Sequence, residues 1–270
     1  MESRPLRCFV AVAEELNFTR AAEKLGISAP PLSRTIRKLE AELGVTLFER
    51  TTHSVALTEA GTVLLEQARI ALDALTAAAH RTRRTAEPKL VLAVKADSDG
   101  GVLDAVVARC TAYPVTIRLC GWGEQPGLLR RGEADAALIH APFDHAGLDF
   151  ETVAEEPRVA AVAAAHPLAG RDSVTLAELG LSVTSAEDVG RFLDRIVEEH
   201  DVRDLPQLLK LVEFGTVTTL LPESVVARYP RPGLAYLRVR DAPPAVLVIA
   251  WPRWSRSREV AALVRAATSG

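Results

Sequence analysis

Residues 17–61 read NFTRAAEKLGISAPPLSRTIRKLEAELGVTLFERTTHSVALTEAG, and this stretch decides the fold of the amino-terminal part of the chain. Its pattern predicts two short helices joined by a tight turn and followed by a β-hairpin. Thr19 is a good N-cap for a first helix over residues 20–25, because its hydroxyl can accept a hydrogen bond from a free backbone N–H group. Gly26 stands where a helix ends with a residue at positive φ. The turn is therefore predicted at residues 26–28.

A second helix is predicted to begin directly after this turn. Ser28 is placed to cap it, and Pro30 and Pro31 are tolerated in a first helical turn, where backbone N–H groups lack intrahelical partners. Apolar residues then recur at helical spacing and form one stripe that we expect to face the core: Leu32, Ile36, Leu39 and Leu43. The other side of this helix carries Ser33, Arg34, Arg37 and Lys38 close together.

A basic face on the second helix of such a pair is suited to the major groove of DNA. An arginine can form two hydrogen bonds with a guanine edge, while neighbouring groups hold phosphates. The alternative is a solvated helix face balanced by Glu40 and Glu42, and for an isolated basic helix we favour that alternative. Three neighbouring patterns reverse this preference here: a hairpin, a preceding helix and a following helix.

The hairpin is predicted over residues 47–57, where it would form a wing that lays Arg50 and His53 against the DNA backbone or minor groove. The preceding helix, residues 5–16, would complete a three-helix core through an apolar side made of Leu6, Phe9, Val10 and Ala13. Both patterns are those of a compact DNA-reading module.

The following helix is predicted from an N-cap at Thr58 to about residue 85. Its apolar positions approximate a heptad seam, at Leu64, Leu65, Ala68, Leu72, Leu75 and Ala79. If nothing in its own domain covers this apolar seam, a second copy of the chain must cover it, and this implies a dimer. A two-fold dimer would read two half-sites of a pseudo-symmetric operator.

Residues 4–61 resemble the winged helix-turn-helix of LysR-type transcriptional regulators. The resemblance is carried by the F..V.E..NFTRAAEKLGIS opening, the PxLSRxIRKLEAELGVxLFER helix and wing entry, and the LTEAG start of the next helix. It places Thr19, Arg20, Pro30, Ser33, Arg34 and Arg37 on the family's DNA-contacting positions, and Arg50 and His53 on its wing. The candidate DNA-binding residues are these eight together with Ser28 and Lys38. Ala29 stands where the family often has Gln, and His53 where it often has Arg, which implies a different operator preference.

Composition agrees with a two-domain regulator. The chain has 270 residues, 48% hydrophobic residues and a net charge of -3, and no export signal or 18-residue apolar span is found in it. We therefore expect a cytoplasmic protein that does not enter membranes. Residues 1–88 hold 12 Lys and Arg against 11 Asp and Glu, a net +1, so any field that attracts DNA must come from local clustering. The three cysteines, Cys8, Cys110 and Cys120, fit neither a disulfide framework nor a zinc site, and we expect no cofactor.

Beyond a polar hinge at residues 81–89, strand and helix patterns alternate. Apolar runs at 90–94, 115–119, 134–140, 158–165, near 181–184, 235–239 and 246–251 predict strands. Helical patterns cover 102–112, 127–131, 187–200 and 255–267. This alternation predicts a doubly wound α/β domain. We expect three parts: a winged helix-turn-helix at 1–58, a linker helix and hinge at 59–88, and a regulatory domain at 89–270.

The same resemblance extends to this second domain through YPVTIRLC, LLRRGEADAALI and AHPLA, and it implies two α/β lobes like those of periplasmic binding proteins, with an effector cleft between them. The second lobe is shorter than the family norm. Cleft residues should follow strand ends, where open α/β sheets bind ligands. The candidates are Lys95, Asp97, Ser98, Asp99, His140, Phe143, Thr184, Ser185, Glu213 and Phe214. Asp97 and Asp99 would repel a carboxylate, so we expect a neutral or cationic effector or none, unless both are solvated loop residues.

Other functions are weaker readings of the sequence. The six histidines form no metal pair at helical spacing, and no GxSxG, P-loop or GxGxxG is present, so the chain is not expected to be an enzyme. A second alternative is a DNA-bound repressor whose second domain only oligomerises. The predicted partners are double-stranded promoter DNA, further copies of the chain in a dimer or tetramer, a small-molecule effector and, for an activator, RNA polymerase.

Overall fold

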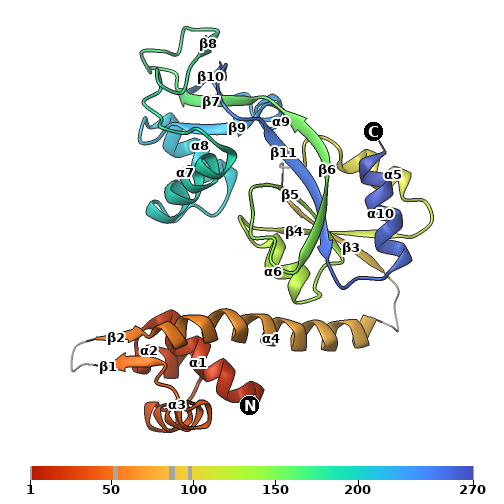
Figure 1. Cartoon of the computed structure of the whole chain (residues 1–270). Coiled ribbons are helices and arrows are strands. Elements are labelled where there is room, and N and C mark those ends of the chain that lie inside the picture. The colour runs from red at the N-terminus through yellow and green to blue at the C-terminus, as the bar shows by residue number, and fades with distance from the viewer. Residues whose placement is uncertain (1, 51–53, 85–88, 97–98, 270) are drawn as a thin grey trace. The chain divides into compact units, whose positions relative to one another are not determined.

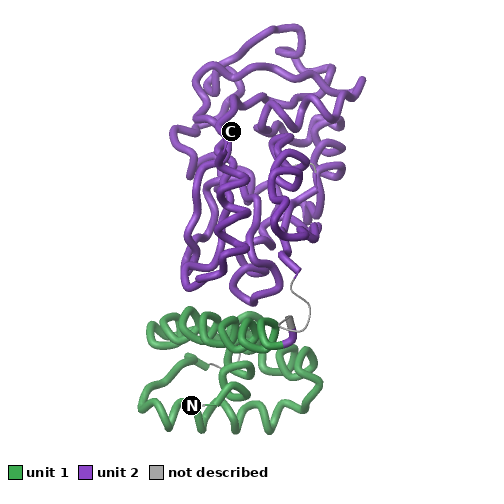
Figure 2. Tube along the Cα trace, turned by 90° about the vertical axis from the view of Figure 1, so that its right-hand side faces the viewer, with its two compact units in different colours: residues 1–82 green, residues 83–270 purple. Residues whose placement is uncertain are grey.

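The computed structural model describes residues 2–50, 54–84, 89–96 and 99–269. The chain forms two compact units, Met1–Thr82 and Arg83–Gly270, and each is described by itself (Figure 2). No helix within the described ranges is both long and apolar enough to cross a membrane.

The first unit contains the predicted helix pair, hairpin and long helix (Figure 1). Its core joins Phe9 of the first helix to Phe48 of the hairpin, with ring centroids 5.3 Å apart, and Phe18 packs edge-on against Phe48 at 5.9 Å. The elements are α1 (Ser3–Glu15), α2 (Phe18–Lys24), α3 (Ala29–Leu43), β1 (Phe48–Arg50), β2 (Val55–Leu57) and α4 (Glu59–Arg84).

The turn between α2 and α3 lies where it was predicted, but the N-caps of the two helices differ from the predicted ones. Gly26 has φ +65°. The cap of α2 is Asn17, not Thr19. The Asn17 side chain accepts hydrogen bonds from the backbone N–H groups of Thr19 and Arg20, so the helix starts at Phe18, two residues before the predicted start. Ser28 occupies the N-cap position of α3 without a side-chain capping bond. Pro30 and Pro31 explain this, because they fill the two positions whose N–H groups a cap would bind.

The long helix α4 begins as predicted, with the Thr58 hydroxyl accepting a hydrogen bond from Gly61 N at 2.9 Å. The predicted dimer seam is wrong in part. Four of its members pack against the core of their own unit: Leu64, Leu65, Ala68 and Leu72. Leu75, a further member of the predicted seam, is 51% exposed. Val63 and Ile70, which the predicted seam did not include, are 59 and 50% exposed.

Gly61 lets α4 approach the segment that leads into the hairpin. A Cβ atom at this position would lie 2.2 Å from the backbone oxygen of Leu47 and 2.9 Å from a methyl group of Leu57. Because backbone must move to relieve such a clash, Gly61→Ala should destabilise the first unit by about 1–3 kcal/mol. Chemical denaturation followed by circular dichroism measures this, and an unchanged free energy of unfolding would contradict the packing. Ala60→Gly is a control without the clash.

The first lobe of the second unit is a five-stranded sheet in the order β4-β3-β5-β11-β6. Strands β3, β4 and β5 are parallel, whereas β11 runs antiparallel to β5 and β6. Leu92 and Val94 face α5 and α10, and the alternating Ala93 faces α6, so helices cover both faces. The bounds are β3 (Leu90–Lys95), α5 (Leu103–Arg109), β4 (Val115–Cys120), α6 (Gln125–Arg130), β5 (Ala136–Ala141), β6 (Leu148–Glu156), β11 (Ala245–Pro252) and α10 (Arg258–Thr268).

The second lobe is a four-stranded sheet in the order β8-β10-β7-β9, which the chain enters after β6 and leaves before β11 (Figure 1). Its elements are β7 (Arg158–Ala163), β8 (Ser173–Val174), α7 (Ala186–Glu199), α8 (Leu205–Glu213), β9 (Thr219–Pro222), α9 (Glu223–Arg228) and β10 (Leu234–Val239). The strand predicted near 181–184 is wrong, since this segment is a loop leading to the cap of α7. Elements β6, β8, α8, β9 and α9 were not predicted.

Candidate functional sites

The basic face of α3 lies opposite its buried stripe. Leu32, Ile36 and Leu39 are 0–1% exposed, whereas Arg34, Arg37 and Lys38 are on the exposed side. Lys38 lies 3.8 Å from Glu42. Within the described ranges, no ion pair is found for Arg34 or Arg37. Ser28 and Pro30 are exposed at the start of the helix, and Ser33 is half-buried. Two guanidiniums are therefore available to a partner on this face.

The two candidates at the start of α2 are also exposed. Thr19 gives its backbone N–H to the Asn17 cap. The Arg20 guanidinium donates a hydrogen bond to the backbone oxygen of Glu15 at 2.6 Å and lies 3.5 Å from its carboxylate. Arg20 is thus held near α1, although it remains accessible to solvent.

Glu40 fastens the hairpin to α3. One carboxylate oxygen accepts hydrogen bonds from Leu47 N at 3.0 Å and Phe48 N at 3.3 Å, and the other lies 2.9 Å from an Arg50 nitrogen. The Arg50 guanidinium also lies 4.7 Å from the centroid of the Phe18 ring. Arg50 therefore holds the hairpin in place, and Glu40 is a structural residue, not the solvated counter-charge considered from the sequence. His53 lies outside the described residues.

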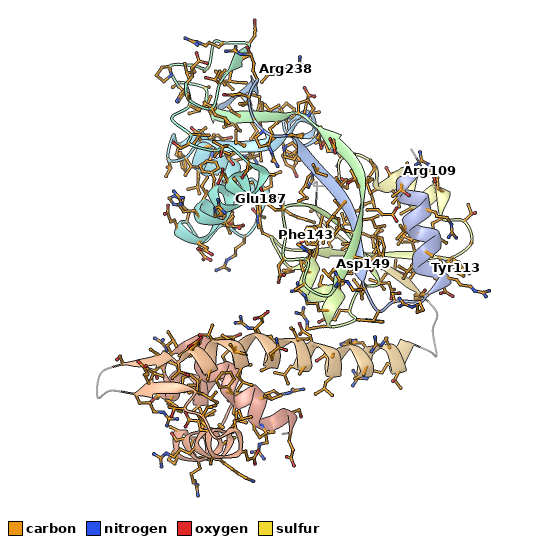
Figure 3. All side chains as sticks on the ribbon, viewed as in Figure 1. Arg109, Tyr113, Phe143, Asp149, Glu187 and Arg238 are labelled. Atoms are coloured by element: carbon orange, nitrogen blue, oxygen red, sulfur yellow. The ribbon has the colours of Figure 1, made fainter. Side chains whose placement is uncertain are left out.

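The second unit holds a cavity of about 680 Å³, lined by residues of both lobes. The first lobe contributes the ends of β3 and β5 and the start of α6, and the second contributes α7, β9 and the start of β7. Phe143 and Glu187, which both line it, come from different lobes (Figure 3). Gly190 on α7 permits this close approach, because a Cβ there would lie 2.8 Å from Pro142 Cγ.

Five basic side chains line this cavity, at Lys95, Arg130, His140, Arg158 and Arg191. Lys95 Nζ lies 3.2 Å from the centroid of the Trp122 ring, and burial lowers the pKa of its ammonium to about 8. Arg158 is 4% exposed, and its Nε donates a hydrogen bond to the backbone oxygen of Pro243 at 3.1 Å. Burial, followed by the charges of Lys95 and Arg158, lowers the pKa of His140 to about 4, so its imidazole is neutral at pH 7. The lining therefore carries four cationic side chains, with His140 neutral, and three carboxylates, at Asp144, Glu187 and Asp194.

Two of the arginines that line the cavity have carboxylate partners. Asp144 lies 2.8 Å from Arg130, and Asp188 lies 2.5 Å from Arg191. Burial, together with the nearby Glu198, raises the pKa of Asp194. Within the described ranges no cluster of His, Cys, Asp or Glu suits a metal ion.

The structure brings some of the effector candidates together and separates the others. His140 and Phe143 line the cavity, as does Lys95. Asp99 does not: its carboxylate lies 2.5 Å from Arg228 and accepts a hydrogen bond from Leu103 N. Thr184 and Ser185 are used in the cap of α7, where both bond to Asp188. Asp97 and Ser98 lie outside the described residues.

Two further candidates lie away from the cavity. Phe214 is 72% exposed beside Lys210, and Glu213 pairs with Lys210 and Arg231. Sequence reasoning missed Trp122 and Arg158. Arg158 had a usable signal, since a charged residue opens an otherwise apolar strand, but Trp122 lies in a loop with no pattern of its own.

Comparison with known proteins identifies the class. A model of bacterial regulatory helix-turn-helix proteins of the lysR family matches residues 3–62, and a LysR substrate binding domain model matches residues 101–270. The chain therefore belongs to the LysR family. It is a transcriptional regulator with a DNA-binding helix-turn-helix domain and an effector-binding domain, which confirms the expected fold and function.

Individual relatives agree with this assignment. The chain is 32% identical to the HTH-type transcriptional regulator IlvR of Caulobacter vibrioides, over 99% of this chain and 98% of that protein. It is 31% identical to the HTH-type transcriptional regulator BudR of Raoultella terrigena, over 96% of this chain and 98% of that protein. A 36% match to AlsR of Bacillus subtilis covers 66% of this chain and 62% of that protein. The structure of full-length CbnR complexed with its target DNA is similar with a TM-score of 0.56 and 25% identity, covering 100% of this chain and 99% of that one.

Proposed function

We propose that the exposed face of α3 reads the operator, with Arg34 and Arg37 as its principal contacts. The observation that carries this proposal is a pair of exposed guanidiniums, without ion pairs to the described residues, on the helix that follows the turn. Ser33 and Lys38 extend the same face, and Thr19, Arg20, Ser28 and Pro30 border it. Arg50 supports the wing and is not proposed as a base contact, because Glu40 and Phe18 already hold its guanidinium.

Arg34→Ala tests this proposal. A lost bidentate guanine contact should weaken operator binding by about 1–3 kcal/mol and relax the preference at one base pair, whereas a lost phosphate contact should weaken all sequences alike. Binding is measured on the DNA upstream of the protein's own gene by titration at fixed salt, with thermal melting as a check of folding. Arg195→Ala, an exposed arginine on α7, is the control. Unchanged affinity in a folded Arg34→Ala protein would contradict the assignment.

The protein is proposed to act as a two-fold dimer joined through α4. Val63 and Ile70, seven residues apart, leave exposed apolar surface on a side of α4 other than the one that packs on its own unit, and Leu75 is exposed on the packed side, seven residues after Ala68. Covering that surface with a second copy would remove it from water and would place two α3 helices for two half-sites.

The cavity between the lobes is proposed as the effector site. A ligand that binds one arrangement of the two lobes better than another shifts the protein toward that arrangement, and so can change how the dimer holds DNA. The alternative is a second domain with a purely structural role. The histidines and carboxylates around the cavity are not proposed to be catalytic. A ligand that binds only the folded state must raise the melting temperature, which separates an effector site from a ligand-free module.

A further inference from the structure

A partly buried ion pair joins the two lobes of the second unit. Asp99, in the loop after β3 of the first lobe, lies 2.5 Å from the Arg228 guanidinium at the end of α9 in the second lobe. Among the ion pairs for which the structure describes both residues, the others of the second unit each join residues of one lobe. Asp99 and Arg228 are called the interlobe pair below.

Asp99 is the buried member of this pair. Its side chain is 8% exposed, whereas that of Arg228 is 40% exposed. Burial by itself raises the pKa of Asp99, but hydrogen bonds from the Arg228 guanidinium and from the backbone N–H of Leu103 outweigh burial and lower that pKa. Asp99 is therefore ionised at pH 7, and its charge is compensated from the other lobe.

Two glycines let the loop of Asp99 approach the second lobe. Gly100 and Gly101 have φ angles of +60° and +77°, in the left-handed region that favours glycine. A Cβ atom at Gly101 would lie 3.6 Å from an Arg228 nitrogen, and one at Gly100 would lie 3.1 Å from a methyl group of Leu247. The loop therefore contacts β11 of its own lobe and Arg228 of the other lobe.

Helix α9, which carries Arg228, is fastened to both lobes. Glu156, the last residue of β6, accepts hydrogen bonds from the backbone N–H of Ser224 at 2.6 Å and from its hydroxyl at 2.8 Å. The backbone oxygen of Tyr229, directly after the helix, accepts a hydrogen bond from the Tyr236 hydroxyl of β10 at 2.6 Å. The first lobe therefore holds α9 at both ends, through Glu156 and the interlobe pair, and the second lobe holds it through β10.

The same helix reaches the cavity through Val225, which lies about one turn before Arg228. Glu156 lies beside the crossover to β7, so a rotation of the lobes about this crossover can keep its bonds to Ser224. Arg228 lies about 6 Å farther along the helix, and the same rotation separates it from Asp99 unless α9 turns and moves Val225. The interlobe pair therefore opposes this rotation.

We propose that the interlobe pair is a latch, which stabilises one arrangement of the lobes and positions α9 against the cavity, so that an effector favouring another arrangement must work against it. This inference rests on the proposed function, in which an effector shifts the lobes. Asp99 and Arg228 are positioning residues, because neither lines the cavity. Without the latch, the lobes sample further arrangements before any effector binds.

The test measures the distance between the lobes in the full-length protein by pulsed electron paramagnetic resonance. A ketone-bearing amino acid at Ala261 of α10 and at Arg195 of α7, both exposed, carries one spin label in each lobe and leaves the native cysteines in place. Labelled chains are mixed with an excess of unlabelled chains, so that the measured distances lie within one chain. Asp99→Asn removes the negative charge but keeps an acceptor for Leu103 N, and Arg228→Gln removes the positive charge.

Two further variants complete the set. Arg238→Gln is the matched control, because Arg238 also pairs with a residue of α9, Glu223 at 3.3 Å, but this pair lies within the second lobe. Arg228→Lys keeps the positive charge, and so should keep most of the latch.

We expect one narrow distance distribution for the wild type, Arg228→Lys and Arg238→Gln. Asp99→Asn and Arg228→Gln should both broaden or shift this distribution, and the double variant should change it no further, because each substitution removes the same interaction. Arg228→Gln should lower the melting temperature more than Asp99→Asn, since it leaves the buried carboxylate uncompensated. Adding Asp99→Asn to Arg228→Gln should restore part of that loss.

Operator affinity is measured in parallel, with circular dichroism as the check of folding. If the lobe arrangement controls how the dimer holds DNA, Asp99→Asn and Arg228→Gln should change operator affinity about fivefold or more, in the same direction. Arg238→Gln should leave it unchanged.

An unchanged distance distribution in folded Asp99→Asn and Arg228→Gln would overturn the inference. So would effects that add in the double variant, or an Arg238→Gln protein whose lobes loosen equally. If the lobes stay fixed in the latch variants while a small molecule still alters operator binding, the latch is wrong and the proposed regulatory function stands. If the lobes loosen while operator affinity never changes, the latch stands and the proposed coupling of the lobes to DNA fails.

Discussion

Ile70→Asp should convert the dimer into a folded monomer, whereas Ala68→Asp, two residues away on the same helix, should unfold the first unit. Ile70 is 50% exposed and Ala68 is 1% exposed, so the two substitutions place the same carboxylate on opposite sides of α4. Because the helix repeats every 3.6 residues, this pair separates the interface from the core of the unit.

The expected losses of dimerisation and folding free energy follow from the surroundings of Ile70 and Ala68. A two-fold interface contains Ile70 twice, and losing both apolar side chains should cost about 3–6 kcal/mol of dimerisation, or about two to four powers of ten in the dissociation constant. In Ala68→Asp a carboxylate enters an apolar core without a partner, which should cost about 3–5 kcal/mol of folding free energy.

Sedimentation equilibrium and far-ultraviolet circular dichroism measure the two outcomes. Glu49→Ala, at an exposed position of β1 and so outside α4, is the control for both. A wild-type monomer at micromolar concentration, or an Ile70→Asp protein that remains dimeric, would refute the interface on this side of the helix.

The described fold was predictable from the sequence where the signal was local. Gly26 and Thr58 act on residues a few positions away in the chain. As predicted, Gly26 adopts a positive φ in the turn, and Thr58 caps the start of α4. The two remaining caps failed for equally local reasons. Asn17 precedes Thr19 and is the stronger cap, and the two prolines after Ser28 remove the N–H groups that its hydroxyl would bind. Helix α8 also had a readable signal, with Asp204 as its cap and apolar residues at helical spacing, at Leu205, Leu208, Leu209 and Val212.

The candidate sites were predictable to a smaller extent, because partners far apart in sequence decide them. Glu40 and Arg50 are ten residues apart and look like two surface charges until the hairpin folds back on α3. Asp99 and Arg228 are 129 residues apart, and their pairing removes a carboxylate from the expected cleft. Periodicity also placed Leu64, Leu65, Ala68 and Leu72 on one side of α4 correctly, but it could not tell whether a second copy or the same unit covers that side.

Lys95 should make the stability of the second unit depend on pH above pH 8. Burial lowers the pKa of its ammonium from its ordinary value of 10.5 to about 8 in the folded protein. Below pH 8 both the folded and the unfolded chain carry this proton, and the full cost of burying the charge is present. Between pH 8 and 10.5 the folded protein releases the proton while the unfolded chain keeps it, so the wild type gains stability as the pH rises.

The difference between the pKa of Lys95 in the unfolded and in the folded chain alone corresponds to about 3 kcal/mol for burying the ammonium. The contact with the Trp122 ring favours the ammonium and offsets part of it, by about 1–2 kcal/mol. We therefore expect a gain of about 1–3 kcal/mol between pH 8 and pH 10, measured as the difference between the wild type and Lys95→Met so that other titrating groups cancel. His140 does not titrate in this window, because burial lowers its pKa to about 4. Cys120 contributes in the opposite direction, because burial raises the pKa of its thiol from 9.0 to about 11 in the folded protein, and this contribution cancels in the difference between the two proteins.

Urea denaturation followed by tryptophan fluorescence, at several pH values between 7 and 10 and without added ligand, measures the difference. Lys95→Met should be the more stable protein at pH 7, and the two free energies of unfolding should converge as the pH approaches 10. If the two proteins keep a constant difference across this range, the Lys95 ammonium is well solvated or already neutralised in the folded protein. The cavity would then lack an uncompensated charge at Lys95.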